Sequence, residues 1–289
     1  MRRLQRPAPS AAETYDLCVS TVANPALRDY FAASRAEIFG SYEDYRQLAE
    51  NQQLHALEPL DGGDDTLVVG HITKKDLKDL YTQQLVGRGK PARSLYDQIL
   101  ASAPFGRCPY CGFGQVSTLD HFLAKAKFPR VAVLPINLVP SCKDCNHGKK
   151  AAVAQIPGEQ VIHPYFESTE IEEEQWLFAA IQETAPVSVT YRATPPATWS
   201  DALQSRASNQ LKDFDLSRRF ALEAANEIAG LTPLLRSLAL IGEQAVREHL
   251  KLVFESEYSL KKNSWRTALY QALANSHWYC EGGHAALIQ

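Results

Sequence analysis

The 289-residue chain has no apolar run approaching the roughly 20 residues that a membrane-spanning helix needs. Internal repeats and low-complexity tracts are also missing, which excludes solenoid and collagen-like proteins. No apolar stretch follows the basic residues at its start, so we expect no secretory signal and a cytoplasmic location. Basic residues number 30 against 33 acidic ones. This balance excludes a protein that binds nucleic acid through its overall charge.

Cysteine is scarce, with six residues, yet four of them form two closely spaced pairs. Two residues separate the members of each pair, which lets both sulfurs of a tight knuckle reach one ion. Thiolates are the ligands of closed, tetrahedral zinc sites, whereas two disulfides are disfavoured in a reducing cytosol. We therefore predict a structural zinc ion (Zn²⁺) held by Cys108, Cys111, Cys142 and Cys145.

The thirty residues between the two knuckles are enough to form structure of their own. β-Branched residues after position 115 favour a short strand that ends on Asp120 and His121. Residues 131–135 predict a second short apolar strand or a turn, and residues 146–153 can start a helix. The predicted order is therefore knuckle, strand, strand, knuckle, helix.

This segment resembles the HNH (His-Asn-His, ββα-metal) endonucleases in their four-cysteine zinc form. The matching residues are the Asp120-His121 pair, Asn137, and Asn146 directly after the last cysteine, and the resemblance covers about residues 107–150. Further segments are similar to bacterial anti-phage HNH nucleases such as the Septu nuclease subunit, which works beside an ATPase: residues 95–97, 163–165 and 263–266. The resemblance implies a metal-dependent endonuclease with DNA as its partner, and an ATPase or other protein as a second partner.

The resemblance also implies a role for each matching residue. His121 would be the general base, since the pKa of a histidine lies near the working pH. Asp120 and Asn146 would bind a catalytic Mg²⁺ or Mn²⁺ through oxygen atoms, which these ions prefer. Asn137 would hold the loop of His121 by hydrogen bonds. His147 is an alternative ligand that suits a softer ion, but Asn146 is preferred because it has the family's position.

The nuclease segment is more basic than the rest of the chain. Residues 101–165 hold seven Lys or Arg against three Asp or Glu. We interpret part of this charge as phosphate contacts, with a merely solvated face as the alternative: Lys125, Lys127, Arg130 and Lys149. One residue departs from the family pattern, because Ala124 stands where a proline is usual.

The flanking regions are predicted to be mainly helical, which makes the chain an α+β protein. We expect a helical region at 1–100, the nuclease module at 101–165, and a helical region with a short β-hairpin at 166–289. Helical spacing predicts helices at 26–39, 42–57, 74–86, 216–230, 234–254 and 265–274. Alternating apolar and polar residues predict hairpin strands at 176–182 and 187–194.

The function predicted from these residues is metal-dependent hydrolysis of DNA phosphodiester bonds, in bacterial anti-phage defence. Two alternatives stay open at this point. The protein could be a nuclease subunit that is inactive until a partner ATPase or another activator releases it. It could also be a non-catalytic zinc module that binds nucleic acid or protein, because four cysteines alone often mark a structural site.

Overall fold

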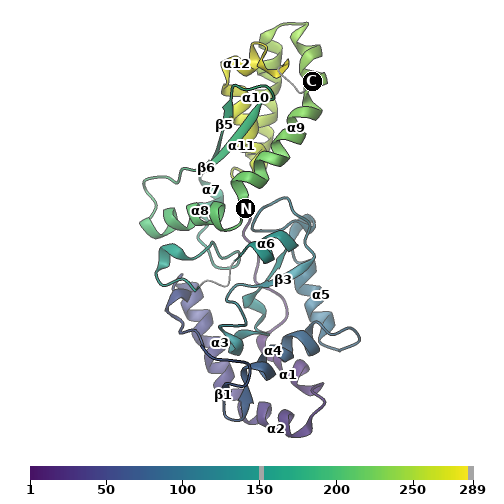
Figure 1. Ribbon diagram of the computed structural model, residues 1–289, viewed down its shortest axis with the longest axis vertical. Coiled ribbons are helices and arrows are strands. Elements are labelled where there is room, and N and C mark those ends of the chain that lie inside the picture. Colours follow the sequence, from purple (N-terminus) through teal and green to yellow (C-terminus); the bar gives the residue numbers. More distant parts are fainter. Residues whose placement is uncertain (150–152, 286–289) are drawn as a thin grey trace. The chain divides into compact units, whose positions relative to one another are not determined.

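The computed structural model describes residues 1–149 and 153–285, and its architecture is α+β (Figure 1). The chain forms two compact units: one holds residues 2–167, and the other holds Met1 together with the chain from Ser168 onward. The predicted regions 1–100 and 101–165 thus share one unit. No helix in the described part of the chain is both long and apolar enough to cross a membrane.

The first unit begins with three helices: α1 Ala11–Ser20, α2 Pro25–Ala33 and α3 Arg35–Glu50. Asn24 caps α2 by accepting from the backbone of Ala26, and Pro25 occupies the first helical position. The boundaries predicted for helices 26–39 and 42–57 were wrong, because the break between the two helices falls at Ser34 and the second helix, α3, ends at Glu50. Short elements follow: η1 Leu54–Ala56 and the paired strands β1 Leu67–Val69 and β2 Ile72–Thr73.

The helix predicted at 74–86 is present in two parts. Helix α4 spans Lys74–Asp79, and a wider helical turn, η2, continues it over Leu80–Leu85. A capping box formed by Thr73 and Asp76 starts α4, since each side chain accepts from the backbone of the other. Helix α5, Arg93–Ala101, follows and packs on the strands of the cysteine segment. A short turn, η3 Pro104–Gly106, leads into the first knuckle.

The cysteine segment has a strand–strand–helix order. Strand β3, Thr118–His121, pairs antiparallel with β4, Leu138–Ser141, so that Asp120 lies opposite Val139. Helix α6, Lys143–Gly148, follows at once and lies beside β3 (Figure 1). The strand that carries Asp120 and His121 is therefore confirmed.

Two details of this segment differ from the prediction. Of the two alternatives for residues 131–135, a strand or a turn, the structure has the turn: they lie among two short helical turns, η4 Pro129–Val131 and η5 Pro135–Asn137, because a proline fixes the first backbone angle of each turn. The second strand starts instead at Leu138. The helix begins at Lys143 rather than at residue 146, and residues 150–152 of the predicted helix lie outside the described residues.

The second unit contains the predicted hairpin, which is confirmed. Strand β5, Leu177–Gln182, pairs with β6, Ser188–Ala193, and the hairpin lies against α9 and α11 (Figure 1). Its helices are α7 Glu170–Glu173, α8 Asp201–Asp213, α9 Leu216–Ala239, α10 Glu243–Leu260, α11 Trp265–Asn275 and α12 His277–Cys280. Two short turns complete the described chain: η6 Pro157–Glu159, in the first unit, and η7 Gly283–Ala285.

The helix predicted to end at Gly230 continues to Ala239. Leu231 and Leu235 extend its buried face past the glycine, and this burial outweighs the weak helix propensity of a single glycine. The break comes at Gly242, whose φ of 148° is open to glycine. The helix predicted at 234–254 was therefore wrong, since this break divides it between α9 and α10.

Candidate functional site

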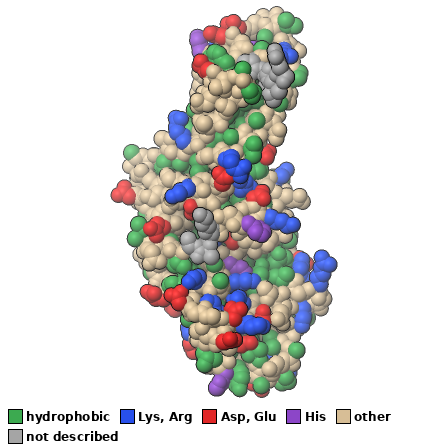
Figure 2. All heavy atoms as spheres, viewed as in Figure 1, with side chains coloured by type: hydrophobic (Ala, Val, Ile, Leu, Met, Phe, Trp, Pro, Cys, Tyr) green, Lys and Arg blue, Asp and Glu red, His purple; other side chains and the backbone are tan. Residues whose placement is uncertain are grey.

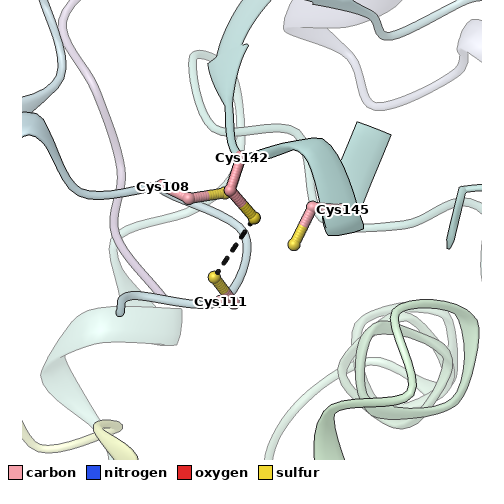
Figure 3. Close-up of side chains that lie close together, drawn as sticks. All are labelled: Cys108, Cys111, Cys142 and Cys145. Atoms are coloured by element: carbon pink, nitrogen blue, oxygen red, sulfur yellow. Dashed lines mark hydrogen bonds between the residues drawn. The ribbon is translucent and has the colours of Figure 1, made fainter. Parts of the chain in front are cut away.

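Four cysteines meet in the interior of the first unit. Their ligand atoms all lie within 4.8 Å of one another, and each cysteine is buried. The four side chains point toward a common centre (Figure 3). Cys108 and Cys111 come from the loop after η3, whereas Cys142 stands between β4 and α6 and Cys145 lies in the first turn of α6. None of the cysteines is in a disulfide, and the Cys111 and Cys142 sulfurs are 3.9 Å apart. Four converging thiols in a closed setting can hold a structural metal ion, with zinc as the fitting ion.

Backbone geometry closes the first knuckle around the sulfurs. The amide of Cys108 donates to the carbonyl of Gly114 at 2.9 Å, and the amide of Gly114 donates to the Cys111 sulfur at 3.3 Å. A Cβ atom at Gly114 would lie 2.7 Å from the Cys142 sulfur. Position 114 therefore has no room for a side chain while the four sulfurs converge.

The thiols also perturb one another electrostatically. Hydrogen bonding, first of all from Cys108, lowers the pKa of Cys111 and lowers the pKa of Cys142 to about 6. Hydrogen bonding within the cluster raises the pKa of Cys108, with Cys111 as its first partner, and the pKa of Cys145, with Cys108 as its first partner. Since the thiolate is the metal ligand, a metal ion bound here would displace the remaining thiol protons.

A buried carboxylate lies next to this cluster. Oδ2 of Asp120 accepts a hydrogen bond from the Tyr110 hydroxyl at 2.9 Å and from Nζ of Lys149 at 3.1 Å. Burial raises the pKa of Asp120, against the opposing effect of the Lys149 charge. Burial also lowers the pKa of Lys149. The pair is held by direct contact in a setting that disfavours either charge alone.

The Lys149 ammonium donates to three oxygen atoms. Besides Asp120, it donates to the backbone carbonyls of His121, at 3.1 Å, and of Phe122. The Phe122 ring lies 4.5 Å from Nζ. One carboxylate and two carbonyls form a cradle that suits a cation, and we call these three oxygens the cation cradle.

His121 has a defined tautomer. Its Nε2 lies 2.8 Å from the carbonyl oxygen of Ala132, and a carbonyl can only accept, so Nε2 carries the proton and Nδ1 keeps a lone pair. The ring packs edge-on against Tyr81, with centroids 4.3 Å apart. Burial of the ring is the main cause that lowers the pKa of His121 to about 3. The imidazole is therefore neutral at neutral pH.

Asn137 is fully buried and holds the loop between the two strands. Its Oδ1 accepts from the Leu123 amide at 2.7 Å, and its Nδ2 donates to the carbonyls of Leu123 and Val131. These bonds join both ends of the 123–131 loop. The loop in turn leads to Ala132, whose carbonyl orients His121.

Asn146 and His147, the two candidates for the ligand that would join Asp120 on a catalytic metal, differ in their surroundings. Asn146, in α6, donates through Nδ2 to the Thr118 hydroxyl at 3.2 Å, and Thr118 shares a face of β3 with Asp120. His147 is exposed, and its Nδ1 donates to the carbonyl of Lys143 at 2.8 Å. Within residues 1–149 and 153–285, only the four cysteines bring three or more His, Cys, Asp or Glu side chains close enough together to hold a metal ion.

The predicted phosphate contacts are engaged within the protein. Lys127 pairs with Asp61 at 2.6 Å, and Arg130 pairs with Glu37 at 3.0 Å. Nζ of Lys125 lies 4.5 Å from the centre of the Tyr81 ring. Blue and red side chains accordingly lie side by side on the surface, without a broad basic field on the face drawn (Figure 2). Lys149 points inward to the cation cradle.

Two tyrosines at this site were not predicted from the sequence. Tyr110 donates to Asp120, and Tyr81 packs on His121 while its hydroxyl donates to the Leu119 carbonyl. The position of Tyr110 between Cys108 and Cys111 could have indicated its role. A residue inside the knuckle must lie close to the strands that the cysteines hold together. Tyr81 gave no such signal, because its spacing is that of an ordinary buried helix face.

The fold and this site define an α+β protein with a buried four-cysteine centre beside an aspartate–histidine pair. No known protein-family profile matches the chain, and no solved structure matches it. The chain is 33% identical to Protein ea31 of Escherichia phage lambda, over 98% of this chain and 100% of that protein. It belongs to the family of that phage protein.

Proposed function

We propose that the protein is a metal-dependent endonuclease of the HNH type that hydrolyses DNA phosphodiester bonds. The observation that carries the proposal is the state of His121, a neutral imidazole next to Asp120 with its Nε2 proton committed to the Ala132 carbonyl. This state leaves Nδ1 as the acceptor that a general base needs. The strand–strand–helix order and the four-cysteine centre support the same class.

In this proposal His121 takes a proton from the attacking water through Nδ1. Burial keeps the ring unprotonated in the free protein. A phosphate anion arriving beside the ring favours the protonated form, which raises the pKa and makes proton uptake easier. Asn137 acts one step away, since it secures the loop that leads to the Ala132 carbonyl and so holds the ring in place.

The residues present fit a divalent cation. The cation cradle already holds an ammonium ion, which supports its preference for positive charge. Asp120 and Asn146 would supply the carboxylate and amide oxygens that Mg²⁺ or Mn²⁺ prefers. When bound, such an ion supplies neutralisation of negative charge on the reacting phosphate. The structural zinc would keep Asn146 next to β3, because Cys142 and Cys145 stand directly before it.

A second candidate is a nuclease subunit that a partner protein releases. The contact between Lys149 and Asp120 favours it, because the ammonium holds the carboxylate that the metal would need. The ion pairs of Lys127 and Arg130 favour it as well, since both cations have acidic partners within the chain. The releasing partner would be an ATPase or another protein. A setting in anti-phage defence stays a prediction.

Cleavage of supercoiled plasmid DNA tests the proposal. Zinc-loaded wild-type protein is compared with His121→Ala and with His147→Ala, an exposed histidine that serves as the matched control. A free nuclease is supported if the wild-type protein cuts only with Mg²⁺ or Mn²⁺. Cutting should then fall by a factor of about 10² to 10⁴ in His121→Ala and persist in His147→Ala. No cutting without a partner protein and cutting with it supports the released subunit. Binding without cutting under both conditions would leave only a zinc module.

A further inference from the structure

An aromatic side chain stands in solvent immediately before the first cysteine knuckle. Phe105 is 89% exposed and lies in the turn that joins α5 to Cys108. Burial normally supplies the stabilisation from an aromatic ring, and here almost none of the ring is buried. The ring therefore contributes little to the core of the first unit.

The backbone at this position is also unfavourable for phenylalanine. Pro104 accepts a hydrogen bond from the Arg107 amide at 3.2 Å, and the two central residues of this turn have positive φ, 58° for Phe105 and 63° for Gly106. This mirror-image turn favours asparagine, aspartate or glycine at its first central position. A strained backbone that carries an exposed ring is typical of a functional position rather than of packing.

Positive charge flanks the ring on the same unit. The Arg2 guanidinium lies 5.5 Å from the centre of the Phe105 ring, and the Arg2 amide donates to the Pro109 carbonyl at 3.0 Å, which ties Arg2 to the knuckle. Arg107 is exposed directly after the turn and donates to the Phe113 carbonyl at 2.7 Å. An exposed ring with the Arg2 guanidinium beside it, and a second exposed arginine two residues along the chain, matches a nucleic acid, which offers a flat base beside a phosphate.

The turn is tied in register to the strand of the candidate site. The Val116 amide donates to the Gly106 carbonyl at 2.9 Å, and Arg107 forms a bridge with Gln115. His121 comes five residues after Val116, which corresponds to about 17 Å along an extended chain. That distance equals about five steps of duplex DNA at roughly 3.4 Å each and fewer steps of an extended single strand, so one short stretch of nucleic acid can reach both places.

We propose that Phe105 stacks on an unpaired base of the DNA substrate, while Arg2 and Arg107 contact the neighbouring phosphates. The site takes single-stranded or locally unpaired DNA, because a base inside a duplex has no free face for the ring. This inference rests on the proposed function for the identity of the substrate. It deepens that proposal by naming unpaired DNA as the form that the protein binds.

Binding without cleavage tests the inference. Zinc-loaded protein without added Mg²⁺ or Mn²⁺ is titrated into a dye-labelled single-stranded DNA oligonucleotide and into a fully paired duplex, with fluorescence anisotropy as the readout. We expect Phe105→Asn to weaken single-strand binding about tenfold, Phe105→Trp to retain it, and duplex binding to change little. Phe105→Asn should keep or raise the unfolding temperature, because asparagine tolerates the turn better. Leu67→Asn, at another exposed apolar residue of the same unit, is the matched control and should leave binding unchanged.

Equal single-strand affinity of wild type and Phe105→Asn overturns the inference, as does an equal loss in Leu67→Asn. Wild-type protein that binds no single-stranded DNA also overturns it, and plasmid cutting by that protein would then leave the nuclease proposal standing. Conversely, Phe105-dependent binding by a protein that cuts DNA neither alone nor with a partner protein supports the stacking site and removes the nuclease.

Discussion

Lys149 places its ammonium 3.1 Å from Oδ2 of Asp120, and both side chains are largely shielded from solvent, with 13% and 7% of their areas exposed. A lysine therefore occupies the place next to the carboxylate that a catalytic cation would need. In the proposed nuclease, a divalent ion would therefore have to compete with this ammonium for the Asp120 carboxylate.

The first prediction concerns this competition. Lys149→Met keeps the apolar stem and removes the charge, so the Asp120 carboxylate loses its cation. We expect Mn²⁺ to bind the zinc-loaded variant about tenfold more tightly, equal to about 1.4 kcal/mol, as measured by calorimetric titration. Without Mn²⁺ the variant should be less stable by about 3 kcal/mol or more, since one half of a buried ion pair remains. Lys127→Met, which removes an exposed pair with Asp61, should change neither quantity much.

The second prediction concerns acid. The pKa of His121 in the folded protein is lowered to about 3 from an ordinary 6.5, so the unfolded chain binds the proton first as pH falls. The stability contributed by neutral His121 is complete above pH 6.5 and is lost as pH falls toward 3. Urea unfolding of wild type and His121→Gln at a series of pH values measures this. The two proteins should converge in stability as pH decreases, and a constant difference would contradict the buried neutral ring.

The third prediction concerns the cysteine centre. Cys145→Ser should lose bound zinc and unfold the first unit at lower temperature, because structural zinc binding contributes folding free energy. Cys280→Ser is the control, since Cys280 is an equally buried thiol outside the cluster. Metal analysis by mass spectrometry and thermal unfolding give the readouts. A Cys145→Ser protein with a full complement of zinc would exclude the four-cysteine site.

The fourth prediction uses a glycine. Gly114→Ala places a methyl group 2.7 Å from the Cys142 sulfur, which forces the knuckle apart. We expect faster loss of zinc to a chelator, followed with a colorimetric indicator, and a stability lower by about 1–3 kcal/mol. Gly63→Ala, where the added carbon meets nothing within 4 Å, should behave as wild type. Equal chelation rates in all three proteins would show that the knuckle tolerates the methyl group.

The sequence predicted those parts of the fold whose signals are local. The alternation around Tyr191 predicted the hairpin, and the cysteine spacing predicted the cluster, because each signal lies in the residues that form the structure. The end of α9 was predicted wrongly at Gly230. There the burial of Leu231 and Leu235, a tertiary effect, outweighs the local preference of glycine.

The cysteine cluster was predictable from the sequence, but the pairing of the charged residues beside it was not. Nothing in the sequence says that Lys149 turns inward to Asp120 while Lys127 pairs with Asp61. Both are lysines in a basic segment, and only the folded chain decides which one is shielded from water. The tautomer of His121 was equally beyond the sequence, because it depends on the carbonyl of Ala132 across a loop.

Asp120 and His121 are neighbours on β3, and successive side chains of a strand point to opposite faces. The carboxylate therefore meets Tyr110 and Lys149 on one side, and the imidazole meets Tyr81 on the other. The strand itself is enclosed, because the carbonyls of Leu119 and His121 accept from Tyr81 and Lys149. In the proposed reaction the carboxylate that would hold the metal and the imidazole that would take the proton lie on opposite faces of one strand, so the scissile phosphate would have to reach both of them around that strand.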